Sequence, residues 1–235
     1  MNQRPKVFLT IDDGPSAGSM ELLNTLQSLS IDAIFFCVGA SLQRHFDEAV
    51  EIAKRGFLIG NHSWDHPHFS KINIAEAREQ ILQTEAMIQK VYEAAGTVRL
   101  YKAFRFPYGD RGAGNSSFQK CFEWAVPHTY ALAKMVRALG FTGPQFISPP
   151  PNHPSFLDRG VDWFWSIDPK DWQWLDENPI SIDEAMRSIP FQNFDPRRTE
   201  ILLLHDQHRS KTMRAQALVH LASHVDFLKF AHLVT

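Results

Sequence analysis

The chain has 235 residues, of which 44% are hydrophobic and 21% charged, and its formal net charge at neutral pH is −2. The 24 basic and 26 acidic residues nearly cancel, which argues against nucleic-acid binding and against a polybasic membrane-binding patch. Only 2 residues are cysteine, whereas 11 are histidine, and this composition favours metal or acid–base chemistry over redox chemistry.

Short apolar segments alternate along the chain with segments of helical spacing. The apolar segments are rich in β-branched and aromatic residues, as in buried parallel strands, and cover residues 6–12, 32–39, 57–63, 103–109, 161–168 and 200–206. The predicted helices cover residues 20–30, 47–56, 74–96, 128–140 and 214–230. Three of them end at a glycine, the residue that most often terminates a helix: Gly56, Gly96 and Gly140. This alternation predicts an α/β fold with a parallel sheet, open or closed into a barrel.

One segment interrupts the alternation. A proline cluster at 147–160 predicts an extended loop, because proline and the residue before it disfavour helix. No long polar linker, low-complexity run or repeat divides the chain. We therefore expect a single domain over residues 1–235, with a long insertion-like segment at about 110–162.

Polar side chains gather where the predicted strands end. In parallel α/β folds the carboxyl ends of the strands lie on one face, and that face carries the functional site. Five of the six strands are followed by such a cluster, namely Asp12 and Asp13; Asn61, His62 and His66; Arg105 and Tyr108; Asp168 and Asp171; His205 and Asp206. We expect these five clusters to converge.

Two histidine pairs have the spacing H-x-x-x-H, which on a helix places both rings on one face. His62 and His66 follow a strand and share its end of the sheet with carboxylates, whereas His220 and His224 lie within the C-terminal amphipathic segment. One carboxylate with two imidazoles is a common ligand set of catalytic zinc. The sequence therefore predicts a metal site at the first pair and a structural role for the second.

The other polar residues allow more than one interpretation. Of two adjacent carboxylates, one could bind a cation while the other acts as a base, but Asp12-Asp13-Gly14 could equally be only a turn. A buried arginine needs an anionic partner, whereas a solvent-facing Arg105 would need none. His205 is a candidate general acid or a core histidine, and Trp172 and Trp174 could contact a sugar ring or an acyl group or simply pack in the core.

These residues together resemble the polysaccharide deacetylases of carbohydrate esterase family 4, the NodB-homology domain. Five segments are similar to the five motifs of that family and occur in the same order: T-I-D-D-G-P at 10–15, H-S-W-D-H at 62–66, R-F-P-Y-G at 105–109, D-P-K-D-W at 168–172 and L-L-H at 203–205. The resemblance implies a distorted, incomplete (β/α) barrel related to the TIM barrel.

The resemblance also implies a role for each matching position. Asp12 would be the catalytic base, and Asp13, His62 and His66 would bind a divalent metal ion, commonly zinc. Arg105 would orient Asp12.

Further roles concern the substrate. The backbone N–H of Tyr108 would stabilise the oxyanion, and His205, oriented by Asp171, would protonate the leaving amine. The residues implied in substrate binding, chiefly as walls of the acetyl pocket, are Trp172, Leu203, Pro107 and Tyr108.

The implied reaction is hydrolysis of an N-acetyl group from an amino sugar or an N-acetylglucosamine-type oligosaccharide or polysaccharide, which would be the chain's partner. The 110–162 segment is long for the family and is expected to reshape the substrate groove. Three alternatives remain open: an O-acetyl esterase acting on xylan-type substrates, a small-molecule amidase, and a carbohydrate-binding protein without catalytic activity.

The N-terminal residues do not predict export or membrane insertion. The strand pattern begins by Val7 with no hydrophobic segment of a signal peptide before it, and no apolar stretch approaches the roughly 18 residues that span a bilayer. The two cysteines, Cys37 and Cys121, form no C-x-x-C pair, which is typical of a reducing compartment. We expect a cytoplasmic protein with no membrane partner, or an exported one if a leader has been removed.

Overall fold

A computed structural model describes residues 4–112, 127–144, 163–173, 184, 199–206 and 211–230. Its centre is a parallel sheet in the order β3-β2-β1-β4, with β5 pairing β1 beside that path. The strands are β1 (Lys6–Asp12), β2 (Ala33–Cys37), β3 (Leu58–Asn61), β4 (Thr199–His205) and β5 (Asp226–Phe227). The predicted parallel α/β fold is confirmed.

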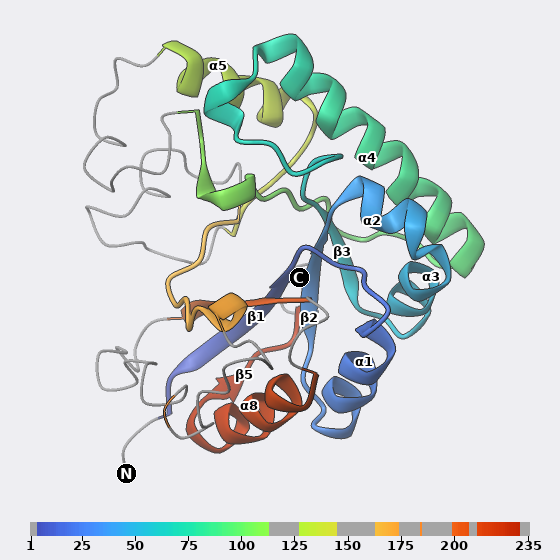
Figure 1. The fold of residues 1–235 in the computed structure, drawn as a ribbon, viewed down its shortest axis with the longest axis vertical. Helices are drawn as coiled ribbons and strands as arrows, with labels where there is room; N and C mark the ends of the chain where they lie inside the picture. The colour runs from blue at the N-terminus through green and yellow to red at the C-terminus, as the bar shows by residue number, and fades with distance from the viewer. Residues whose placement is uncertain are drawn as a thin grey trace.

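Helices cover the sheet on its outer face. Figure 1 shows α8, α1, α3 and α4 following one another around the strands, with α5 beside the N-terminal half of α4. The helices are α1 (Ser19–Ser28), α2 (Gly39–Arg44), α3 (Phe46–Lys54), α4 (Ile74–Ala95), α5 (Pro127–Ala138) and α8 (Lys211–His224). Within the described residues, single turns of 3₁₀ helix are η1 (Phe69–Lys71), η2 (Pro107–Gly109) and η4 (Asp171–Gln173). No helix of the described residues is long and apolar enough to cross a membrane.

The sequence explains the ends of the longest helix. The Asn73 side chain accepts hydrogen bonds from the backbone N–H groups of Ala75 and Glu76, and the Glu76 carboxylate accepts one from the Asn73 N–H. This reciprocal capping satisfies N–H groups that have no partner within the helix. At the other end Gly96 adopts a left-handed conformation with φ 66°, which glycine tolerates without a side-chain clash.

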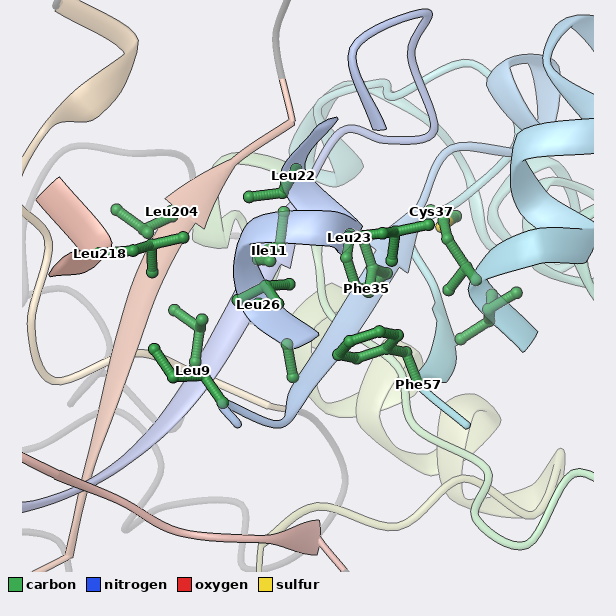
Figure 2. Packing of buried hydrophobic residues seen from close by; sticks show 14 of the residues in the cluster. Leu9, Ile11, Leu22, Leu23, Leu26, Phe35, Cys37, Phe57, Leu204 and Leu218 are labelled. Carbon is green, nitrogen blue, oxygen red and sulfur yellow. The ribbon is translucent and has the colours of Figure 1, made fainter. Parts of the chain in front are cut away.

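Alternation along the strands divides the buried side chains between two faces. Leu9 and Ile11 of β1 pack with Leu26 of α1 and Leu218 of α8 in the main core (Figure 2). Burying each such side chain contributes about 1.5–3 kcal/mol. The intervening residues face the other side, where Phe8 packs with Ile34, Phe36, Trp163 and Ile201. Thr10 and Asp12 continue this second face toward the carboxyl end of β1.

Two predicted strands are wrong in their extent. Within 103–109 only Phe104 makes a strand-like bridge, to Asn61, and a 3₁₀ turn follows because Pro107 has no N–H to donate. Within 161–168 the described residues form one bridge, between Ile167 and Leu202. These segments lie at the two opposite edges of the sheet, beside β3 and β4, and the N–H of Trp163 donates to the carbonyl oxygen of Phe104 between them. This arrangement suits a distorted barrel.

Smaller differences concern helices and the insertion. The helix predicted over 214–230 spans Lys211–His224 and is followed by β5, and the short helix α2 was not predicted. Residues 113–126 and 145–162 of the insertion-like segment, with its proline cluster, lie outside the described residues, as does Trp174. The single-domain organisation stays a prediction.

Candidate metal and catalytic site

The carboxyl ends of β1, β4 and β3 bring the predicted site residues together. Asp12 ends β1 and is paired in register with His205 of β4, and the backbone N–H of His62, just after β3, donates to the carbonyl of Cys37 at the end of β2. Paired residues of adjacent strands point to the same face. The ends of β1, β4 and β3 therefore each supply a polar group to one site.

Asp13, His62 and His66 form a group that could hold a metal ion. One ligand atom from each lies within 4.8 Å of the others. The Oδ1 atom of Asp13 is 3.6 Å from Nε2 of His62 and 3.2 Å from Nε2 of His66, and the two Nε2 atoms are 3.2 Å apart. Two ligand atoms bonded tetrahedrally to zinc at 2.0–2.1 Å lie about 3.3 Å apart, so the spacing fits such an ion.

The protonation of His62 also suits a ligand. Its Nδ1 lies 2.9 Å from the carbonyl oxygen of Arg105, which can only accept, so Nδ1 carries the hydrogen and Nε2 keeps its lone pair. Burial lowers the pKa of His62 to about 4, so the ring is neutral at pH 7. Burial would raise the pKa of Asp13, but the hydrogen bond with His66 and the nearby imidazoles bring it well below its usual range.

His62 and His66 do not lie on a helix, although their spacing is compatible with one. They lie in a loop after β3 in which Ser63 (φ 65°) and His66 (φ 61°) adopt left-handed conformations. Asn61 anchors this loop: its side-chain amide donates to the carbonyl oxygen of Ile81 and to the carboxylate of Glu85, and its oxygen accepts from the N–H of Ser63. The irregular turn, rather than helical periodicity, brings the imidazoles together.

Asp12 is held by a buried arginine. Nη1 of Arg105 donates to Oδ1 of Asp12 at 2.7 Å and to the Thr10 hydroxyl at 2.9 Å, and its Nε donates to the carbonyl oxygen of Trp163. The arginine is 1% exposed and Asp12 is 3% exposed, so the solvent-facing alternative for Arg105 is wrong. The other oxygen of Asp12, Oδ2, lies 3.5 Å from Nε2 of His62, beside the Asp13–His62–His66 group.

His205, which is partly buried, and the buried Asp171 form a second pair. Nδ1 of His205 lies 2.7 Å from one carboxylate oxygen of Asp171, and the backbone N–H of His205 donates to the other. Burial would lower the pKa of His205, but the hydrogen bond and negative charge of Asp171 outweigh it, with Asp13 and Asp12 adding to the effect, and raise the pKa to about 9. At neutral pH this imidazole carries a proton that it can give away.

A third cluster forms around Asp206, which the sequence places at a strand end but without a role or partners. The buried carboxylate of Asp206 accepts hydrogen bonds from the hydroxyls of Ser16 and Ser19 and from Nη1 of Arg214. Its backbone N–H donates to the carbonyl oxygen of Asp12. A Cβ atom on Gly14 would lie 2.8 Å from this carboxylate, which explains the glycine after the two aspartates. The position of Asp206 directly after His205 was the available signal.

The residues implied in substrate binding differ in exposure. Leu203, paired in register with Thr10, and Pro107 are buried. Tyr108 and Trp172 are 49% and 47% exposed. The residues implied in substrate binding therefore comprise two buried apolar side chains and two half-exposed aromatic ones.

The second histidine pair lies apart from the metal group. His220 and His224 are stacked on α8 with ring centroids 4.4 Å apart. In the part of the chain that the structure describes, no third carboxylate, imidazole or thiol completes a metal group around them.

Comparisons with known proteins point to one family. The sequence model described as polysaccharide deacetylase matches residues 2–119, just over half of the chain. A peptidoglycan-N-acetylglucosamine deacetylase of Bacillus cereus is 24% identical over 188 residues, covering 80% of this chain and 54% of that protein. The peptidoglycan-N-acetylmuramic acid deacetylase PdaC of Bacillus subtilis is 34% identical over 104 residues, covering 44% of this chain and 21% of that protein. The chain thus spans about half or less of the length of these relatives.

The solved structures agree with the fold. A crystal structure of a peptidoglycan N-acetylglucosamine deacetylase is similar with a TM-score of 0.65 and 21% identity, over 99% of this chain and 89% of that one. This confirms the distorted, incomplete (β/α) barrel. The family match and the shared fold together establish that the chain belongs to the polysaccharide deacetylase family.

Proposed function

We propose that this chain is a metal-dependent hydrolase that removes N-acetyl groups from an amino sugar in an N-acetylglucosamine-type oligosaccharide or polysaccharide. One observation carries the proposal: the Asp13–His62–His66 group lies beside two hydrogen-bonded pairs, Asp12 with Arg105 and His205 with Asp171. The peptidoglycan deacetylases among its relatives support an amino-sugar substrate.

Asp13, His62 and His66 would hold a divalent cation, most readily Zn²⁺. The donor set of two imidazole nitrogens and one carboxylate oxygen leaves a position open, as catalytic zinc requires, and the neutral His62 needs no deprotonation to bind. When bound, such an ion polarises a carbonyl oxygen and makes water more acidic. The rest of the chemistry belongs to side chains of this chain.

Asp12 would act as the base. One of its oxygens is held by Arg105, which leaves Oδ2 toward the metal group, 3.5 Å from His62. From there it can take a proton from the water whose oxygen attacks the acetyl carbon. The backbone N–H of Tyr108 would donate to the oxyanion that develops on the carbonyl, and a preorganised donor of this kind supplies about 3–4 kcal/mol in other enzymes.

His205 would act as the acid. When the carbon–nitrogen bond breaks, its protonated ring gives a proton to the leaving nitrogen, so that the products are acetate and the free amino sugar. Asp171 holds the ring through Nδ1 and leaves Nε2 to face the substrate. The acetyl group would lie in a pocket lined by Trp172, Leu203, Pro107 and Tyr108.

The test is to compare three acetylated substrates on the chain stripped of metal and reloaded with Zn²⁺. N-acetylglucosamine oligomers should yield acetate and free amine only in the reloaded sample. If acetate were released from acetylated xylan alone, the chain would be an esterase and the proposal would be wrong. Acetate release from small amides alone would instead show an amidase. Glycan binding without any product at saturating Zn²⁺ would instead show a carbohydrate-binding protein.

A further inference from the structure

The ring of Tyr108, in η2, lies between His68 and the Asp13–His62–His66 group. The imidazole of His68 stacks on the phenol of Tyr108, with ring centroids 4.0 Å apart and planes tilted by 14°. The same phenol meets the ring of His66 edge to face at 4.4 Å. His68 lies outside the five motif segments, yet only one ring separates it from a proposed metal ligand.

A buried carboxylate holds His68 in place. Nδ1 of His68 lies 3.4 Å from Oδ2 of Asp110, whose side chain is fully buried. This carboxylate also accepts from the N–H and the hydroxyl of Ser70, at 3.1 and 2.6 Å, and from the N–H of Gly112 at 3.0 Å. The imidazole therefore contacts a carboxylate that is itself held by several hydrogen bonds, which restricts the rotation of the His68 side chain.

Tyr108 needs such support because its backbone is strained. Its φ of 58° lies in the left-handed region, which costs a residue other than glycine about 1–3 kcal/mol. Backbone hydrogen bonds hold the two residues after Tyr108: the N–H of Gly109 donates to the carbonyl oxygen of Phe106, and that of Asp110 to the carbonyl oxygen of Pro107. Tyr108 is 49% exposed, so core packing does not fix its ring, and the stacked face of His68 supplies the broad contact.

We infer that His68 is a positioning residue that keeps Tyr108 in this left-handed conformation and so aims its backbone N–H at the reacting carbonyl. This inference rests on the proposed function for the role of the N–H. The ring of His68, rather than its ability to bind metal or protons, does the positioning, since stacking requires only a flat face against the phenol.

The experiment compares His68→Ala, His68→Phe and, as a matched control, His45→Ala, whose side chain has similar exposure (21% against 29%) but lies at the start of α3. For His68→Ala we expect kcat on N-acetylglucosamine oligomers to fall about tenfold or more, as for a misaligned catalytic group. KM and Zn²⁺ affinity should stay within about twofold. His68→Phe should keep most of the activity, and His45→Ala all of it.

A readout independent of activity is the NMR spectrum of Tyr108. Stacking shifts its ring protons upfield, and the chain has only 4 tyrosines to assign. The ring and amide resonances of Tyr108 should move in His68→Ala and return toward wild type in His68→Phe. Unchanged resonances in His68→Ala would overturn the inference even if the wild-type chain deacetylates nothing, which would separately defeat the proposed function. Equal losses of kcat in the alanine and phenylalanine variants, or a matching loss of Zn²⁺ affinity, would also overturn it.

Discussion

His205 and Asp171 are joined by two hydrogen bonds of 2.7 Å, one from the imidazole Nδ1 and one from the backbone N–H, each to a different oxygen of the same carboxylate. The double contact fixes both the orientation of the ring and its place at the end of β4. It also brings a negative charge against a partly buried imidazole, which is why the pKa of His205 rises to about 9 although burial acts in the opposite direction.

We predict that Asp171→Asn shifts the alkaline limb of the kcat–pH profile to lower pH. His205 must be protonated to act as acid, so activity is present below its pKa and lost as the pH rises through it. Removing the charge of Asp171 lowers that pKa and moves the loss downward. Steady-state kinetics between pH 6 and 10 measure the shift. An alkaline limb at the same pH in wild type and variant would show that another group sets it.

Asp12→Asn should lower kcat by about 10²–10⁴-fold, the usual contribution of a general base, while Zn²⁺ still binds. The asparagine keeps the shape of the side chain and can still contact Arg105, but it cannot take a proton. Activity and metal content are measured on the same sample. Asp13→Asn provides the contrast, because it should lose metal affinity as well. Full activity in Asp12→Asn would remove Asp12 as the base.

Chelation should abolish activity, and Zn²⁺ should restore it. Because the ion binds only the folded chain, zinc at about 100 times its Kd should also stabilise the fold by about 2.7 kcal/mol, seen as a higher Tm. His62→Ala should lose both responses, whereas His220→Ala, from the second histidine pair, should keep them. A zinc response abolished by His220→Ala and retained by His62→Ala would place the metal elsewhere.

Asp206→Ala should destabilise the fold by about 3–5 kcal/mol, because it leaves the buried guanidinium of Arg214 without its carboxylate. The matched control is Asp226→Ala, which removes an exposed ion pair with Arg4 and should cost about 0.5 kcal/mol or less. Urea unfolding followed by circular dichroism measures both. Similar stability of the two variants would mean that the Asp206 cluster contributes little to folding.

Several features of this protein could be predicted from residues close together in the sequence. The apolar runs of β1, β2 and β4 and the spacing of α4 are local patterns, and each was recognised with its approximate bounds. The segment 103–109 does not form the strand that its apolar residues predict, because its hydrogen bonding depends on Pro107 and on the sheet edge that it meets.

The strand–helix alternation and the polar groups that follow the strands can be predicted from the amino-acid sequence, because hydrophobic periodicity and residue type are local properties. Which of these groups contact one another depends on how the elements pack. Arg105 reaches Asp12 across 93 residues, and Asp171 reaches His205 across 34. The left-handed turns at Asp13, Ser63 and His66, and the stack of His68 on Tyr108, depend on contacts from several elements at once, and no periodicity in the chain records such contacts.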